Sequence, residues 1–303
     1  MIERKPLRTI PEHYPLSCQW EITCRCNLRC VMCYTDCFNR ADKIRTELST
    51  DEIIRIMDEL AEAGCMELCL TGGEPLARPD FFQVYEHAKS NGFLVTLFTN
   101  GTLITEEVAD QLAALPPHRI EISLHGLQEK TFEGVAQGKG SFQRCMTAIR
   151  LLLDRNLPLV LKTTAMTLNK DEILAIKRHV RSLGPVGYRL GEDMRPTLDG
   201  SDAPKRWALS EAELLDINRQ DPELWNETRR KQSRQPPSCV SGMRSFHIDA
   251  YGQLQLCSAN RQMSYDLRRG SFIEGFYHAL PSFPCRWKSE TPGPLIQPSA
   301  IHA

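Results

Sequence analysis

The chain has 303 residues, of which 37 are basic and 38 acidic, for a formal net charge of −1. Such a length suits one large α/β barrel or two ordinary domains, and the balanced charge gives no basic footprint for nucleic acid. No apolar run approaches the ~18 residues needed to span a membrane, and residues 1–6 lack the apolar core of a secretion signal. We therefore expect a cytoplasmic protein that contacts neither nucleic acid nor membrane.

Twelve cysteines in such a chain indicate metal or redox chemistry, because disulfides are rare in the cytosol. Six of them crowd residues 18–37, and three more lie near the other end of the chain. Cys65, Cys69 and Cys145 fall within apolar helix or strand patterns, so we predict that they are small core residues.

The first motif is a cysteine triplet that follows a short strand pattern at Trp20–Thr23. Cys26, Cys30 and Cys33 have C-x3-C-x2-C spacing, and thiolates suit iron–sulfur clusters, copper(I) or zinc. Structural zinc sites and four-iron clusters normally take four protein ligands. Three cysteines therefore indicate a cubane with one iron left open to a ligand that is not protein. The alternative is a zinc site completed by Cys24 or Cys37.

Strand and helix patterns then alternate along the chain. A capping box at Ser49 and Glu52 starts a helix that Gly64 closes. Later strands are expected at Glu67–Thr71, Leu94–Phe98, Ile120–Leu124, Leu159–Met166 and Val186–Leu190, and later helices at Phe81–Asn91, after an N-cap at Thr105, at about Phe142–Asn156, and from a capping-box-like start at Asn169 and Glu172 to near Gly184. Alternation of this kind implies a parallel sheet with right-handed crossovers. Six units are too few for a complete eight-stranded barrel, and by pattern alone a partial barrel and a doubly wound open sheet fit equally well.

The strand at Glu67–Thr71 runs directly into Gly72-Gly73-Glu74-Pro75. Two glycines allow a tight turn and a close approach of the backbone to a ligand. Glu74 presents a carboxylate at the carboxyl end of the strand, where barrel enzymes keep their sites.

Together, the cysteine triplet and the GGEP turn resemble the radical S-adenosylmethionine (radical SAM) superfamily. The resemblance covers roughly residues 16–190 and implies a partial (β/α)6 barrel of the TIM type. It implies a [4Fe–4S] cluster on Cys26, Cys30 and Cys33, with S-adenosylmethionine (AdoMet) on the open iron and its amino group held by the turn at Gly72–Glu74. A flavodoxin or ferredoxin would supply the electron that cleaves AdoMet to a 5′-deoxyadenosyl radical, which takes hydrogen from the substrate.

Four further positions match the family less specifically. Met32 corresponds to the residue that packs the adenine, and Tyr34 follows the third cysteine as in many relatives. Asn100 belongs to a Thr-Asn-Gly turn on the same rim, and Ser123 matches a hydroxyl that contacts the ribose. Ordinary roles as a turn and a strand-end serine are the alternatives. His125 is a candidate acid–base group, although a lone histidine is more often structural, so no catalytic residue is assigned.

Residues 192–237 carry prolines and charges, and we predict a linker with one short helix capped by Ser210 and Glu213. Beyond it, Cys239, Gly252 and Cys257 resemble the opening of the auxiliary-cluster extension called SPASM, or twitch in its shorter form. Residues 246–256 between these cysteines predict a β-hairpin with the glycine in its turn.

The extension departs from the family pattern after the hairpin. Cys285 matches the first member of a later cysteine run, and no cysteine follows it. The resemblance thus implies an auxiliary iron–sulfur cluster on Cys239, Cys257 and Cys285 that lacks its usual ligands; a zinc site is the alternative. The expected divisions are a lead at 1–15, the radical SAM core at 16–191, the linker at 192–237, the extension at 238–288 and a disordered tail at 289–303.

Radical SAM proteins with SPASM-type tails most often modify peptides. The resemblance therefore implies maturation of a ribosomally synthesised peptide or protein by crosslinking, oxidation or epimerisation. One alternative is a twitch-type enzyme that acts on a small molecule, for example by dehydrogenating an alcohol. Another is a metal-binding scaffold without catalytic activity.

Overall fold

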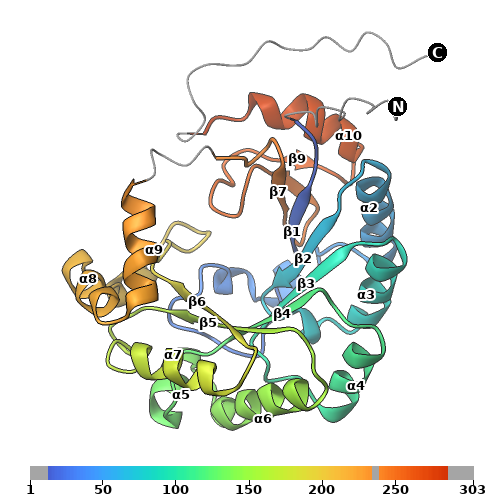
Figure 1. The fold of residues 1–303 in the computed structure, drawn as a ribbon. Helices are drawn as coiled ribbons and strands as arrows, with labels where there is room; N and C mark the ends of the chain where they lie inside the picture. The colour runs from blue at the N-terminus through green and yellow to red at the C-terminus, as the bar shows by residue number, and fades with distance from the viewer. Residues whose placement is uncertain (1–12, 234–238, 286–303) are drawn as a thin grey trace, which may run out of the picture.

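The computed structural model describes residues 13–233 and 239–285. Its centre is one nine-stranded sheet with the strand order β6-β5-β4-β3-β2-β1-β7-β8-β9. The sheet curves, and most of the helices cover its outer side (Figure 1). It begins at β6 and ends at β9, so the barrel is open.

Six neighbouring parallel strands form the main part of the sheet. They are β1 (Ser17–Thr23), β2 (Glu67–Gly72), β3 (Leu94–Thr99), β4 (Arg119–Ser123), β5 (Leu159–Thr164) and β6 (Gly187–Gly191). Each strand lies beside its predecessor, whereas a doubly wound sheet reverses direction at a switch point. The predicted partial (β/α)6 barrel is confirmed, and the doubly wound alternative is wrong.

The helices follow the strands in the predicted alternation. They are α1 (Ala41–Ile44), α2 (Thr50–Glu62), α3 (Phe81–Ser90), α4 (Glu106–Ala114), α5 (Glu129–Ala136), α6 (Ser141–Asp154), α7 (Ile173–Ser182), α8 (Glu211–Arg219), α9 (Pro222–Ser233) and α10 (Phe272–Glu274). The capping boxes at Ser49 and Ser210 and the N-cap at Thr105 are confirmed. We did not predict α5, or α9, which makes the linker helical over much of its length. None of the helices in the described part of the chain has the length and apolar character that crossing a bilayer requires.

The predicted capping box at the start of α7 is wrong. This helix begins at Ile173, and Glu172 occupies the N-cap position without a side-chain cap. The Asn169 amide donates to the backbone oxygen of His125 (3.0 Å), and the Glu172 carboxylate accepts from the backbone N–H of Leu127 (2.6 Å). Both side chains thus hold the loop after β4. A polar side chain that makes such a contact is not available to cap the helix.

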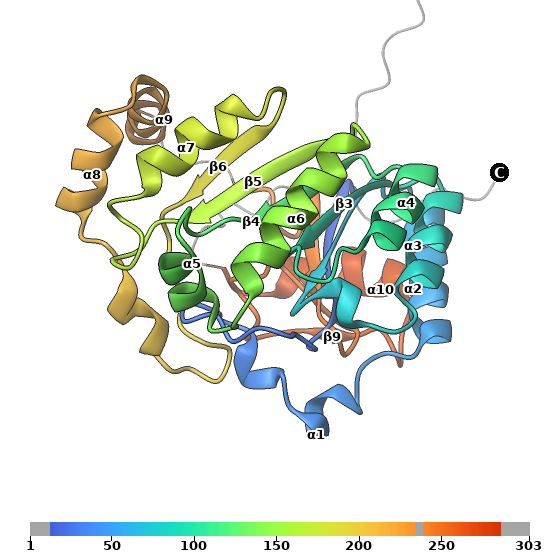
Figure 2. The same cartoon turned by 90° about the horizontal axis from the view of Figure 1, so that it is seen from below.

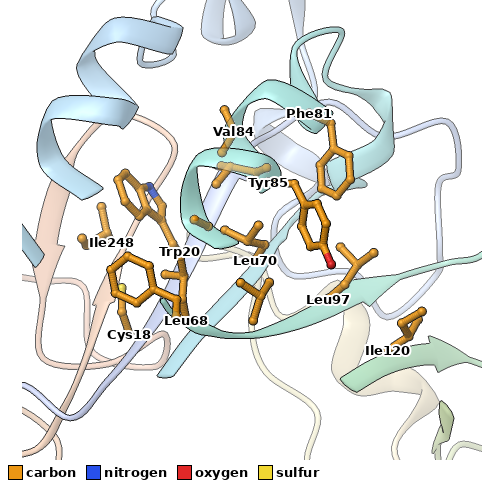
Figure 3. Packing of buried hydrophobic residues seen from close by; sticks show 14 of the residues in the cluster. Cys18, Trp20, Leu68, Leu70, Phe81, Val84, Tyr85, Leu97, Ile120 and Ile248 are labelled. Carbon is orange, nitrogen blue, oxygen red and sulfur yellow. The ribbon is translucent and has the colours of Figure 1, made fainter. Parts of the chain in front are cut away.

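The main hydrophobic core lies between the outer face of the sheet and the helices. Trp20 on β1 and Leu70 on β2 are fully buried there, and they pack with Val84 and Tyr85 of α3 (Figure 3). Cys65 and Cys145 belong to the same core, as predicted.

The core prediction is wrong for Cys69. Side chains alternate between the two faces of a strand, and Cys69 lies between Leu68 and Leu70 on β2. Its side chain consequently lies on the inner face, where it lines a cavity and is only partly buried.

The predicted hairpin is confirmed, but it does not stand apart from the barrel. Strands β7 (Ser245–Ile248) and β8 (Gln253–Gln255) are antiparallel, and Gly252 between them has a φ of +81°. The parallel pairing of β7 with β1 joins the hairpin to the barrel sheet. The short strand β9 (Tyr265–Asp266) then pairs with β8.

Three helical turns follow β9, namely α10, Gly275–Ala279 and Leu280–Ser282. Phe272 and Phe276 from these turns pack against Phe246 of β7. The tail predicted to be disordered, 289–303, lies outside the described residues.

Candidate functional site

The loop after β1 carries Cys26, Cys30 and Cys33 at the carboxyl end of the barrel strands. Two backbone bonds fix this loop against the end of α5, from Arg29 N–H to the Ala136 oxygen (3.2 Å) and from Val31 N–H to the Val135 oxygen (3.0 Å). The loop continues toward α1, which projects beyond the other helices at one end of the barrel (Figure 2). The predicted cysteine triplet therefore lies on a loop that these backbone hydrogen bonds fix in position.

The three thiols lie close enough to influence one another electrostatically. Burial raises the pKa of Cys26 to about 12 and raises the pKa values of Cys30 and Cys33 above their ordinary value. Cys33 adds to the rise in the pKa of Cys26, and Cys33 and Cys26 both add to the rise in the pKa of Cys30. Three neighbouring thiolates are therefore unfavourable alone, and a bound metal centre would both deprotonate and neutralise them.

In the described part of the chain, no three His, Cys, Asp or Glu side chains converge as ligands of one metal ion. Each cysteine of a cubane binds a different iron, so the sulfurs need not converge on a point. The soft donors, their proximity and their burial fit a cluster bound through Cys26, Cys30 and Cys33.

The GGEP turn packs against the backbone that leads into the cysteine loop. Gly73 N–H donates to the Thr23 oxygen (2.9 Å), and Glu74 N–H donates to the Arg25 oxygen (2.7 Å). A Cβ atom would lie 2.2 Å from the Thr23 oxygen at Gly72 and 2.3 Å from the Arg25 oxygen at Gly73, and Gly72 has a φ of +142°. Only glycine fits at these positions, which gives the two residues a packing role in addition to the predicted ligand contact.

Glu74 is fully buried and hydrogen-bonded to the end of β3. Its carboxylate accepts from the Thr99 hydroxyl (2.8 Å) and from the backbone N–H groups of Asn100 (2.7 Å) and Leu76 (3.2 Å). Burial nevertheless raises the pKa of Glu74 to about 7. No ion pair joins Glu74 to a cation among residues 13–233 and 239–285. A buried carboxylate in this state gains from a bound ammonium group, which fits the predicted contact with the amino group of AdoMet.

Asn100 connects this turn to the cysteine loop. Its amide donates to the Asn27 oxygen (3.0 Å) and lies 3.9 Å from the Cys26 sulfur. The structure therefore brings Glu74, Asn100 and Cys26 together. Ser123 ends β4 on the same rim and is partly buried.

Met32 and Tyr34 lie in the same loop, but the contacts of Tyr34 lead away from the triplet. The Tyr34 hydroxyl donates to Glu21 (3.1 Å), and the Arg261 guanidinium lies 5.5 Å from the centroid of its ring. Arg261 also donates to Glu21 (2.8 Å). Met32 is partly buried.

Sequence reasoning missed the polar cluster around Glu21. His247 of β7 is fully buried, with Nε2 3.7 Å from the Glu21 carboxylate, and neither ring nitrogen has a hydrogen-bond partner among the described residues. Charges from Arg261 and His247 hold the pKa of Glu21 well below its usual range despite burial. The sequence did contain one signal for this cluster, namely Glu21 within the otherwise apolar end of β1. Alternation of side chains along the strand places Glu21 on the inner face of the sheet.

His125 follows β4 and lies buried beside the barrel interior. Its Nδ1 accepts from the Thr164 backbone N–H (3.2 Å), and burial followed by the charge of Lys162 lowers its pKa to about 4. It is therefore a neutral imidazole at physiological pH, which argues against a role as a cationic acid.

The three cysteines of the extension lie on different segments. Cys257 forms a β-bridge with Asn260, and the Asn260 amide donates to the Pro284 oxygen (2.8 Å). This bond holds the chain before Cys285 against the turn that follows Cys257. Cys239 precedes β7 and is partly buried.

An open parallel barrel with a partly buried cysteine triplet at its carboxyl rim is typical of barrel proteins that bind an iron–sulfur cluster. The family model described as the radical SAM superfamily matches residues 20–180, more than half of the chain. This protein belongs to the radical SAM superfamily. Membership implies a [4Fe–4S] cluster and AdoMet.

Individual relatives support the same assignment. The AdoMet-dependent heme synthase of Methanosarcina barkeri is 35% identical over 171 residues, covering 56% of this chain and 48% of its own length. Mycofactocin maturase MftC of Mycobacterium tuberculosis H37Rv is 30% identical over 261 residues, covering 82% of this chain and 61% of its own. The chain thus spans about half of the first relative and less than two thirds of the second.

The crystal structure of Streptococcus suis SuiB bound to the precursor peptide SuiA has the same fold. It superposes with a TM-score of 0.68 over 90% of this chain and 68% of its own, at 14% identity.

Proposed function

We propose that this protein is a radical SAM enzyme that matures a ribosomally synthesised peptide or protein by crosslinking, oxidation or epimerisation. The observation that carries the proposal is the joining of the partly buried cysteine loop to the Glu74 and Asn100 turns at the carboxyl rim. Cys26, Cys30 and Cys33 would hold the cluster, with Met32, Tyr34, Gly72–Glu74, Asn100 and Ser123 around AdoMet. When bound, the cluster and AdoMet supply the 5′-deoxyadenosyl radical.

The chain's own residues would bind and orient AdoMet and keep water away from it. The Glu74 carboxylate would hold the amino group of AdoMet, and the Asn100 side chain would fix the position of the loop at Cys26. The triplet and the turn are partly or fully buried, which limits side reactions of a radical with solvent. A flavodoxin or ferredoxin would be the electron donor.

Two relatives favour a peptide substrate. MftC, named a maturase, matches this chain over most of its length, and SuiB, with the same fold, binds a precursor peptide. Another observation favours a small molecule, because the relative at 35% identity is named a heme synthase. A twitch-type enzyme acting on a small molecule is therefore the second candidate.

Reconstitution of the full chain with iron and sulfide under anaerobic conditions, followed by reduction with dithionite, tests the radical activity. We expect 5′-deoxyadenosine from the wild type and from Cys24→Ala, and none from Cys30→Ala. Cys24 is the matched control because it is a buried thiol of the same loop that contacts Tyr251 (3.3 Å). Equal activity in both variants would contradict the ligand assignment, whereas no 5′-deoxyadenosine from the wild type would leave the scaffold interpretation.

The substrate class is tested with short peptides encoded beside the gene. A mass change in such a peptide that depends on AdoMet and Cys30 supports maturation. Turnover of a small molecule without any peptide product supports the second candidate.

A further inference from the structure

Four charged side chains meet on the inner face of the barrel. Glu121 of β4 has a fully buried carboxylate, with only 1% of its side chain exposed. Arg189 of β6 donates to it (3.1 Å), and Lys162 of β5 and Arg119 of β4 lie 3.5 Å from it. Three cations thus surround one carboxylate and leave a local excess of positive charge.

The cations remain accessible although the carboxylate does not. The side chains of Arg119, Lys162 and Arg189 are 41%, 35% and 57% exposed. The Lys162 ammonium lies 4.0 Å from the centroid of the Phe98 ring, a contact that orients a cation without neutralising it. Burial and the neighbouring Arg189 lower the pKa of Lys162 despite Glu121, as expected where positive charge is in excess.

Three of these groups, Arg119, Glu121 and Arg189, line a cavity of about 380 Å³ together with Phe98. The first residues of β1 to β4 also line it, so it reaches the amino ends of the strands. Strand β4 has five residues, and its two ends are roughly 13 Å apart at about 3.3 Å per residue. Arg119, the first residue of β4, lies at the end away from the rim, whereas Lys162 pairs with Ser123 at the last position. The cationic group therefore extends from the cavity toward the rim where AdoMet is proposed to bind.

The second acid of the lining does not cancel this excess. Glu67 is the exposed first residue of β2, and within the described residues no ion pair joins it to any of the three cations. Charged groups inside a cavity with low-dielectric walls interact more strongly than on an open surface. A guanidinium beside an ammonium is suited to a carboxylate ligand.

We propose that Arg189 and Lys162, backed by Glu121 and Arg119, form a carboxylate-binding site in the barrel interior, which selects substrates that carry an acidic group. The proposal rests on the proposed function and names the substrate class of that site: a peptide with an acidic side chain or a free C-terminus. The carboxylate replaces water on Arg189 and Lys162, while Glu121 keeps both cations in place.

The test measures binding of three small probes to the reconstituted full chain with AdoMet present. N-acetylglutamic acid α-amide represents an acidic side chain, N-acetylglycine a C-terminal carboxylate, and N-acetylglutamine amide the uncharged control. We expect at least one carboxylate probe to bind about tenfold or more tightly than the amide. The carboxylate probe that binds more tightly shows whether the acidic group of the substrate is a side chain or a C-terminus.

Variants locate the site. Arg189→Gln and Lys162→Met should each lose about tenfold in affinity for that probe, and Lys162→Arg should recover most of it. Arg150→Gln, on the exposed face of α6, is the matched control and should bind as the wild type does. AdoMet affinity and 5′-deoxyadenosine formation without substrate should be unchanged throughout.

Several results would overturn the proposal. One is that the wild type binds the carboxylate and amide probes equally at millimolar concentration. Another is that Arg150→Gln loses as much affinity for the carboxylate probe as Arg189→Gln does. Weakened AdoMet binding in Lys162→Met would mean that the anion is the carboxylate of AdoMet itself. A wild type that binds the carboxylate but forms no 5′-deoxyadenosine would contradict the proposed function and leave the site intact.

Discussion

Glu74 shows how one side chain can link stability to ligand binding. Its pKa is raised to about 7 from an ordinary 4.5, so the folded protein without AdoMet binds more protons than the unfolded chain between these values. The stability that Glu74 contributes is complete below pH 4.5 and is lost as the pH rises through 7. A bound ammonium reverses this preference, because it favours the carboxylate.

We predict that AdoMet affinity of the wild type falls as the pH is lowered below 7, by up to about tenfold per unit if one proton is coupled. Glu74→Gln should bind AdoMet more weakly at pH 8 and lose this dependence, while its iron content stays unchanged. Equilibrium dialysis across this range measures both. The amino group of AdoMet titrates equally with both proteins, so the difference isolates Glu74. An unaltered affinity would leave Glu74 with the role of fastening β2 to β3.

Glu47 acts on the other side of the cysteine loop. Its carboxylate accepts from the Thr23 hydroxyl (2.9 Å) and the Cys24 backbone N–H (2.5 Å), and it lies 3.5 Å from the Arg25 guanidinium. Glu47→Ala leaves these buried donors without a partner, at a cost of about 2 kcal/mol. We predict lower stability and faster loss of iron from the reconstituted protein, measured with a chelator. Glu62→Ala, at the end of α2, is the control and should match the wild type.

At the scale of elements, the two capping boxes predict different consequences for the same substitution. Ser49 starts α2, whose Ile53, Ile56, Met57 and Leu60 are fully buried, whereas α8 buries far less. Loss of either cap costs about 1 kcal/mol locally. We predict that Ser49→Ala lowers the free energy of global unfolding by about that amount. Ser210→Ala should instead accelerate hydrogen exchange mainly in α8 and leave the global value nearly unchanged. Equal global losses would mean that α8 is part of the same cooperative unit.

The elements that the sequence predicted well are those whose signals are local. Caps at Ser49 and Ser210, and apolar runs such as Glu67–Thr71, depend on neighbours in the chain, and the structure has them. Asn169 and Glu172 have the spacing of a capping box, but their side chains instead contact His125 and Leu127 in the loop after the neighbouring strand β4. No local pattern reports such a competition.

The candidate site likewise contains residues that local sequence signals predict and residues that depend on contacts between distant segments. The spacing of Cys26, Cys30 and Cys33 and the glycines at 72 and 73 could be read from the sequence. The pairing of Glu21 with Arg261, 240 positions later in the chain, could not, because it depends on β7 lying beside β1. Alternation within β1 and β4 would still have placed Glu21 and Glu121 on the inner face.

Taken as a whole molecule, the extension is part of the barrel. Residues Ser245–Ile248 pair with Ser17–Trp20, and Arg268 bonds to the backbone oxygens of Thr46 and Glu47. We predict that a chain ending at residue 233 loses cooperative unfolding, because the edge of β1 and the apolar residues beneath α10 become exposed. Removal of 289–303, predicted to be disordered, should leave the midpoint of thermal unfolding unchanged. A stable, cooperative 1–233 fragment would show that the barrel folds without its extension.

The iron content of the whole protein tests the auxiliary cluster. Cys239, Cys257 and Cys285 are three ligands where a cubane normally takes four cysteines, although the bond from Asn260 to Pro284 draws two of their segments together. We predict that the reconstituted protein holds about four tightly bound irons, from the cluster of the cysteine loop. The Cys26/Cys30/Cys33→Ala triple variant should then retain little cluster absorbance, whereas Cys239→Ala should change the tightly bound iron only slightly. Stoichiometric iron with a [4Fe–4S] signal in the triple variant would mean that another ligand completes the second site, for which Cys69, facing the same cavity as Cys257, is the first residue to substitute.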